Sequence, residues 1–168
     1  MKHLILGGTR SGKSHFAEKQ AMITGKNLIY VATAEALDDE MHARIVHHQQ
    51  SRTGNWITVE EPLALAATLQ REAANDRCIL VDCLTLWLTN LLLSDEESFQ
   101  REHAALLNIL PDLSGDIIFV SNEVGTGIVA ADPLSRRFVD EAGRLHQALA
   151  KNCDKVTLVV AGLPLSLK

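Results

Sequence analysis

The chain has 168 residues, of which 46% are hydrophobic and 22% are charged, values typical of one globular domain spanning residues 1–168. Its net charge of −5 argues against a nucleic-acid-binding surface, which normally carries a basic excess. A small-molecule partner fits this charge balance better.

The first elements along the chain predict a phosphate-binding loop. Residues 4–6 are a short apolar run, expected to be a buried strand of a parallel sheet. The pattern G-x-x-x-x-G-K-S follows, in which backbone N–H groups surround phosphates, the lysine contacts the β and γ phosphates, and the serine binds Mg²⁺. Its members are Gly7, Gly8, Thr9, Arg10, Ser11, Gly12, Lys13 and Ser14. The apolar spacing from Phe16 to Ile23 predicts a helix whose N-terminus faces the phosphates, so we expect a bound nucleoside triphosphate.

Strand-like and helix-like segments alternate along the rest of the chain. Further strands are expected at residues 28–32, 79–81, 117–120 and 156–160, and helices at residues 62–74, 98–110 and 134–150. Pro62 and Pro133 are expected in first helical turns, where a missing N–H is tolerated. The alternation predicts an α/β fold of the P-loop NTPase-like type, with a mostly parallel central sheet and helices on both faces.

Ligands of such a sheet collect at the carboxyl ends of its strands. Asp82 closes an apolar strand, where phosphate-loop sites usually place the carboxylate that reaches Mg²⁺; it could instead cap a helix beginning near Leu84. Residues 121–127, with the sequence Ser-Asn-Glu-Val-Gly-Thr-Gly, follow another strand. They are interpreted either as a substrate loop or as a simple connection.

Residues 38–50 predict a helix with an unusual face. Glu40, Arg44, His47 and His48 lie on one side of it. An imidazole near an α-phosphate can attack it and split one transfer into two easier steps, and arginines such as Arg44 and Arg52 can hold phosphate oxygens. The spacing alone equally fits a solvated face, and zinc binding by His42, His47 and His48 lacks a clean tetrahedral set.

Several segments together resemble one family. They are residues 7–14, residues 38–41 with Arg44-Ile45 and His47-His48, residues 122–129 and residues 159–164. These segments are similar to those of the bifunctional adenosylcobinamide kinase / adenosylcobinamide-phosphate guanylyltransferase family of cobalamin biosynthesis. The resemblance implies phosphorylation of adenosylcobinamide with ATP or GTP. It then implies transfer of GMP from GTP to the new phosphate, giving adenosylcobinamide-GDP and pyrophosphate.

The resemblance also implies roles for individual residues. His47 would carry the guanylyl group and Lys13 would act with it in catalysis, while Ser14 and Asp82 would hold Mg²⁺. The implied nucleotide contacts, beyond the phosphate loop, are Ala32, Thr33, Ala34, His48, Gln49, Gln50, Ser51, Glu60 and Asp82. The family further implies a corrinoid substrate and a homotrimer. The chain departs from the family at Ala130, where proline is common, at Asp82, where glutamate occurs, and at residues 49–51.

Two other functions also use a phosphate loop. Another small-molecule kinase on the same fold would use the phosphate loop and Asp82 without needing His47. A GTP switch would carry an N-K-x-D motif, whereas residues 151–154 read Lys-Asn-Cys-Asp, in the wrong order.

The remaining sequence features indicate a cytoplasmic protein. Cys78, Cys83 and Cys153 form no C-x-x-C pair and are expected to be buried thiols in a reducing compartment. No apolar stretch is long enough for a signal peptide or a membrane span. The histidines outside residues 38–50 have no surrounding constellation, and none is assigned a role; they are His3, His15, His103 and His146.

Overall fold

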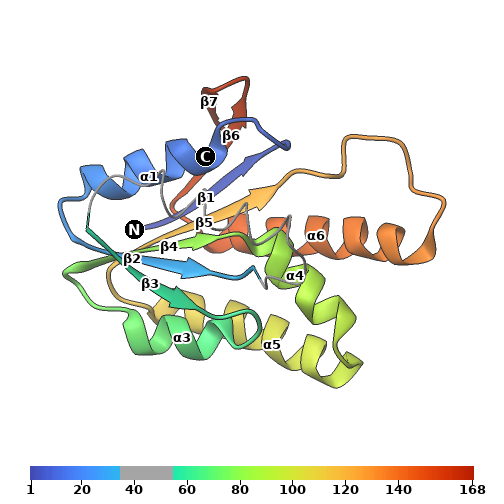
Figure 1. Ribbon diagram of the computed structural model, residues 1–168, viewed down its shortest axis with the longest axis horizontal. Coiled ribbons are helices and arrows are strands. Elements are labelled where there is room, and N and C mark those ends of the chain that lie inside the picture. Colours follow the sequence, from blue (N-terminus) through green and yellow to red (C-terminus); the bar gives the residue numbers. More distant parts are fainter. Residues whose placement is uncertain (35–54) are drawn as a thin grey trace.

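The computed structural model describes residues 1–34 and 55–168, which build one seven-stranded sheet in the order β3-β2-β4-β5-β1-β6-β7 (Figure 1). The strands are β1 (Lys2–Gly7), β2 (Asn27–Ala32), β3 (Trp56–Glu60), β4 (Arg77–Asp82), β5 (Asp116–Asn122), β6 (Lys155–Val160) and β7 (Leu163–Ser166). All neighbouring strands pair in parallel except β6 and β7, which are antiparallel. The expected mostly parallel sheet is therefore confirmed.

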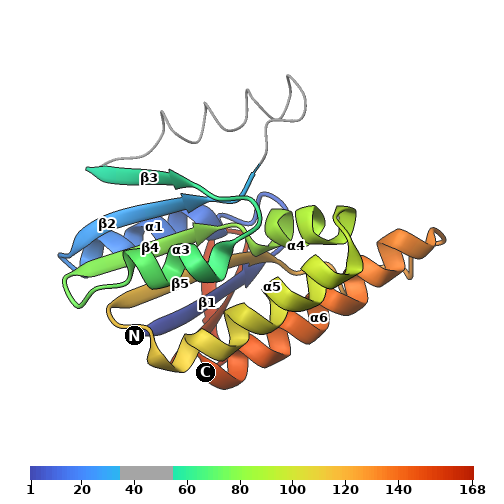
Figure 2. The same ribbon diagram turned by 90° about the horizontal axis from the view of Figure 1, so that it is seen from below.

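Helices cover both faces of this sheet (Figures 1 and 2). They are α1 (Lys13–Ile23), α3 (Leu65–Glu72), α4 (Leu84–Leu93), α5 (Glu96–Ile109) and α6 (Pro133–Asn152), with a 3-10 turn η1 (Leu110–Asp112) after α5. Alternate residues of β1 enter different cores, as expected for a strand buried on both sides. Ile5 packs with Ala17 and Ala21 of α1, whereas Leu4 and Leu6 belong to the core under α3, α4, α5 and α6.

The five strands expected from the sequence are present, each one to three residues longer than predicted. The strands β3 and β7 were not predicted, because both lie at the sheet edges and lack the buried run used to recognise a strand. All four residues of β7 are exposed, and it contains Pro164, which an edge strand can accommodate.

The helix predicted from Pro62 begins three residues later, at Leu65. The Glu61 carboxylate accepts hydrogen bonds from the N–H groups of Leu63 and Ala64, at 3.0 and 2.7 Å, and this turn occupies the segment before the helix. The expectation for Pro133 is confirmed, since it occupies the first turn of α6 behind an Asp132 cap.

All three cysteines are free, with Cys78 and Cys153 buried and Cys83 half-buried. Within residues 1–34 and 55–168, every helix is too short or too polar to cross a lipid bilayer.

Candidate functional site

The phosphate loop joins the end of β1 to the first turn of α1. Arg10 and Gly12 have φ angles of 57° and 91°, and these left-handed conformations curl the chain. The Ser11 N–H donates to the Gly8 carbonyl at 3.2 Å, and the Lys13 ammonium donates to the same carbonyl at 3.2 Å. The loop therefore has a closed shape, with its lysine folded back across it.

Close backbone approaches hold the loop against the turn between β6 and β7. A Cβ on Gly7 would lie 2.5 Å from Ser11 Oγ and 2.6 Å from the Val159 carbonyl oxygen, so only glycine fits there. The Gly162 N–H donates to the Ser11 carbonyl at 2.8 Å, and a Cβ on Gly12 would approach Gly162 Cα to 3.3 Å. The β6–β7 turn thus supports the phosphate loop from the side opposite β5.

Asp82 ends β4 at the edge of the sheet that is formed by the carboxyl ends of the parallel strands, where the phosphate loop also lies. It lies two strands from β1, roughly 10 Å along that edge. The N-cap of α4 is Cys83, without a side-chain cap, so the alternative that Asp82 caps this helix is wrong. Burial, with the Asp82 charge adding to it, raises the pKa of the Cys83 thiol to about 11, and the Lys13 charge opposes the rise. Both charges therefore influence the Cys83 thiol, in opposite directions.

The residues present suit a magnesium ion. The side chains of Asp82 and Ser14 form no hydrogen bond with the described part of the chain. A carboxylate and a hydroxyl near the loop therefore remain available to bind an ion. Mg²⁺ prefers oxygen ligands of this kind and commonly takes one or two protein ligands plus phosphate oxygens.

Residues 32–34 lie where β2 reaches the same edge. The Thr33 hydroxyl donates to the Cys83 carbonyl at 2.7 Å and accepts from the Cys83 N–H at 2.9 Å. The Thr33 carbonyl accepts the Asn90 amide at 2.9 Å. Thr33 is completely buried, so its hydroxyl joins the ends of β2 and β4, whereas Ala34 is half-buried beside it.

Glu60 is separated from the phosphate loop by three intervening strands, β2, β4 and β5. It is the exposed last residue of β3, paired with Ala32 of β2, and it lies four strands from β1. With about 4.8 Å per strand, it is roughly 19 Å from the phosphate loop, too far to contact the same phosphates. If it contacts the nucleotide, it does so at the opposite end.

The histidine-bearing segment lies outside the described residues. This applies to the predicted catalytic residue His47, to the predicted nucleotide contacts His48, Gln49, Gln50 and Ser51, and to the helix expected over residues 38–50. The described chain resumes at Asn55, before β3, so the segment connects β2 to β3.

One side-chain cluster at this edge was missed by sequence reasoning. Its centre is His146 of α6, assigned no role above, whose Nε2 lies 2.7 Å from Ser121 Oγ of β5. The His146 Nδ1 lies 3.9 Å from Glu123 Oε2, in the loop after β5. The only sequence signal was a histidine within the apolar stripe of the helix, and such a signal names no partner.

The fold and the loop define a P-loop NTPase. Solved structures with the same fold include the RadB recombinase, with a TM-score of 0.54, 16% identity, and coverage of 94% of this chain and 73% of that one. The flagellar accessory protein FlaH from Methanocaldococcus jannaschii gives a TM-score of 0.55 at 14% identity, covering 99% of this chain and 77% of that one. These likenesses concern the fold alone.

The chain belongs to the cobinamide kinase / cobinamide phosphate guanyltransferase family, CobU, whose model matches residues 3–167. It is 58% identical to the bifunctional adenosylcobalamin biosynthesis protein CobP of Pseudomonas aeruginosa, across 100% of this chain and 98% of that protein. It is 38% identical to the corresponding CobU of Salmonella typhimurium, with both chains covered completely. The family resemblance read from the sequence is thus confirmed, and the chain is an enzyme of this class.

Proposed function

We propose that residues 1–168 act as one P-loop nucleotide-binding and transferase domain that performs two reactions at one phosphate loop. The first phosphorylates the aminopropanol hydroxyl of adenosylcobinamide with ATP or GTP. The second transfers GMP from GTP to the resulting phosphate. The observation that carries this proposal is a complete, closed phosphate loop in a chain whose family model names both activities.

In the kinase reaction, the loop N–H groups and Lys13 hold the β and γ phosphates while the γ-phosphoryl group moves to the acceptor hydroxyl. Positioning and charge stabilisation account for most of the rate in such transfers. Bound Mg²⁺, held by Ser14 and Asp82, would neutralise charge on the phosphate oxygens.

In the guanylyl transfer, His47 attacks the α-phosphorus of GTP and pyrophosphate leaves. A covalent guanylyl-histidine results, and the phosphate of adenosylcobinamide phosphate then displaces the histidine nitrogen. Lys13 and the loop N–H groups stabilise the departing pyrophosphate in the place where they hold the γ-phosphoryl group during the kinase reaction. The assignment of His47 rests on the family resemblance.

A product assay separates this function from its nearest alternative, a small-molecule kinase without the second reaction. The purified protein would be incubated with adenosylcobinamide, GTP and Mg²⁺, and the corrinoid products followed by mass spectrometry. We expect adenosylcobinamide phosphate first and adenosylcobinamide-GDP later. Accumulation of the phosphate alone would support the kinase alternative, and no corrinoid product would contradict both.

We also propose a cytoplasmic homotrimer. The family resemblance suggests the trimer, and an exposed apolar edge supports a subunit interface: the exposed fractions are 57% for Val160, 72% for Leu163, 57% for Leu165 and 56% for Leu167. Unpaired edge strands with apolar side chains are normally covered by another chain. Three free thiols suit a reducing compartment.

A further inference from the structure

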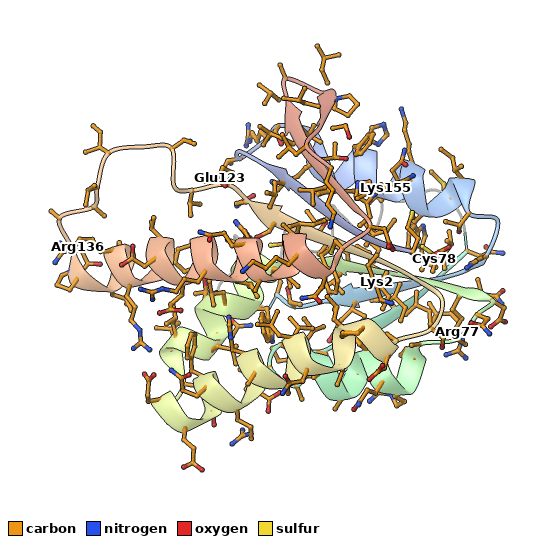
Figure 3. All side chains as sticks on the ribbon, turned by 180° about the vertical axis from the view of Figure 1, so that it is seen from behind. Lys2, Arg77, Cys78, Glu123, Arg136 and Lys155 are labelled. Atoms are coloured by element: carbon orange, nitrogen blue, oxygen red, sulfur yellow. The ribbon has the colours of Figure 1, made fainter. Side chains whose placement is uncertain are left out.

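Glu123 lies directly beside the phosphate loop. Its N–H donates to the carbonyl of Gly7 at 3.1 Å, because β5 and β1 are neighbours and Asn122 pairs with Gly7. Figure 3 shows Glu123 at the point where the chain leaves β5 for the long connection to α6. The backbone of Glu123 therefore lies next to the first residue of the loop that holds the triphosphate, and its side chain starts from this point.

The Glu123 carboxylate accepts one backbone hydrogen bond, approaches His146 on its other oxygen and remains accessible to solvent. Its Oε1 accepts the Gly125 N–H at 2.7 Å, and its Oε2 lies 3.9 Å from His146 Nδ1. The Glu123 side chain is 29% exposed, whereas the His146 side chain is 9% exposed. The carboxylate is thus open to solvent, and the imidazole beside it is buried.

A series of polar groups behind His146 is consistent with one direction of its hydrogen bonds. The Asn122 N–H donates to Thr85 Oγ1 at 2.8 Å, and Thr85 Oγ1 lies 3.5 Å from Ser121 Oγ. Ser121 Oγ lies 2.7 Å from His146 Nε2. In this arrangement the Thr85 oxygen accepts the backbone N–H and its hydroxyl donates to Ser121, which leaves the Ser121 hydroxyl to donate to Nε2.

His146 is neutral in this arrangement, with its proton on the nitrogen that faces Glu123. Burial lowers the pKa of His146, and the Glu123 charge opposes this lowering only in part. A neutral imidazole that accepts at Nε2 donates at Nδ1. A movement of about 1 Å would bring the Nδ1–H into hydrogen-bond distance of Glu123, a change common between ligand-free and substrate-bound sites.

We propose that Glu123 is the general base of the kinase reaction and that His146 is its positioning residue. This inference rests on the kinase activity proposed above. As the acceptor oxygen forms its bond to the γ-phosphorus, the acceptor O–H bond breaks and its proton passes to the Glu123 carboxylate. The bond between the γ-phosphorus and the bridging oxygen breaks, and the nucleoside diphosphate leaves with that electron pair. Glu123 then releases the proton to water.

The guanylyl transfer has no such requirement. A neutral imidazole attacks phosphorus with its lone pair, and the phosphate of the second acceptor is already an anion without a proton to remove at the attacking oxygen. The two reactions therefore differ in their need for the Glu123 carboxylate, although they share the phosphate loop. This difference separates a general base from a residue that merely supports the loop.

The test compares the two reactions in Glu123→Gln. The amide keeps an oxygen that can accept the Gly125 N–H but cannot take a proton at neutral pH. We expect kcat for phosphorylation of adenosylcobinamide to fall about 10²- to 10⁴-fold, with KM changed less than about threefold. Guanylyl transfer to supplied adenosylcobinamide phosphate should stay within about threefold of wild type. The matched control is Glu97→Gln, at an exposed position in the first turn of α5.

Substitutions of His146 test its positioning role by the same two assays. His146→Ala should lower kcat for phosphorylation about tenfold and spare guanylyl transfer. His146→Asn, which can keep a donor at the Nδ1 position, should recover part of the loss. His103→Asn is the control, because His103 on α5 is a partly buried histidine whose pKa is also lowered by burial.

Equal loss of both reactions in Glu123→Gln would overturn the proposal and assign Glu123 to loop structure, and unchanged phosphorylation would also overturn it. If melting curves show that Glu123→Gln does not fold, His146→Ala provides the test. Loss of phosphorylation alone supports the proposal, and equal loss of phosphorylation and guanylyl transfer contradicts it. A wild-type protein that performs neither reaction would contradict the proposed function. If the wild-type protein performs both reactions, the proposed function stands, and the Glu123 and His146 variants alone decide whether Glu123 is the general base.

Discussion

His3 and His146 are both buried, and the imidazole of each lies within hydrogen-bond distance of a hydroxyl group. In the structure each meets a hydroxyl from a segment more than 20 residues away: His3 Nε2 lies 2.8 Å from Thr157 Oγ1, and His146 Nε2 lies 2.7 Å from Ser121 Oγ. Such partners come from strand neighbours and helix packing, which no local pattern contains.

His3 predicts a specific loss of stability in acid. Burial, with the charge of Lys155 adding to it, lowers the pKa of His3 from 6.5 to about 4. Because the folded state disfavours protonation, the stabilisation is complete above pH 6.5 and is lost as the pH falls from 6.5 toward 4. His3→Gln, which can keep the bond to Thr157, should reduce the loss of unfolding free energy between pH 7 and pH 5 by about 2 kcal/mol.

Urea unfolding at the two pH values measures this difference. The exposed His15 provides the control, and His15→Gln should retain the full acid loss of the wild type. An unchanged pH dependence in His3→Gln would show that His3 is protonated without cost in the folded protein.

At the scale of elements, buried strands were predictable and edge strands were not. The runs that became β1, β2, β4, β5 and β6 are apolar on both faces, since helices cover both sides of the sheet. Three residues of β3 and all four residues of β7, among them Ile57 and Leu163, are as exposed as loop residues. Their strand conformation depends on pairing with β2 and β6, and no local sequence pattern predicts that pairing.

The junction of β1, the phosphate loop and β6 predicts the effect of a methyl group at Gly7. A Cβ there would lie 2.5 Å from Ser11 Oγ and 2.6 Å from the Val159 carbonyl oxygen, so Gly7→Ala must displace the loop or the strand. We expect nucleotide affinity to fall at least about tenfold and the unfolding free energy to fall by about 1–3 kcal/mol. Titration with a fluorescent GTP analogue and thermal melting measure the two quantities.

Gly143→Ala is the matched control for that experiment. Gly143 lies within α6, and a Cβ at this position would meet no atom within 4 Å. The substitution should leave affinity unchanged and raise stability by about 0.5–1 kcal/mol, because alanine favours helix. Wild-type affinity in Gly7→Ala would show that the loop does not need this close approach.

At the scale of the whole molecule, the strand order brings together residues that are far apart in the sequence. The ends of β1, β5 and β4 are neighbours, so the phosphate loop, Glu123 and Asp82 share one edge, while Glu60 lies at the far end of that edge. The sequence predicted that the phosphate loop, Asp82 and Glu123 come at the ends of strands, but it predicted neither the strand that ends at Glu60 nor which strands are adjacent. The resemblance supplied the role of His47, which lies outside the described residues.

The exposed β7 edge predicts the behaviour of the proposed trimer. A charge introduced there would have to be buried at the interface, which is costly without a partner. Leu165→Glu should therefore convert a particle of three subunits to one subunit, as measured by light scattering during gel filtration. Leu93→Glu, at a similarly exposed leucine that ends α4, should keep the wild-type mass. A trimer that survives Leu165→Glu would place the interface elsewhere.

The central claim, that one loop serves two transfers and that a histidine carries the guanylyl group, is tested most directly by labelling with α-labelled GTP. The wild-type protein should acquire acid-labile label, and His47→Ala should acquire none while still phosphorylating adenosylcobinamide. His103→Ala should label as the wild type does, and Lys13→Ala should lose both reactions. Persistent acid-labile labelling of His47→Ala would contradict the account.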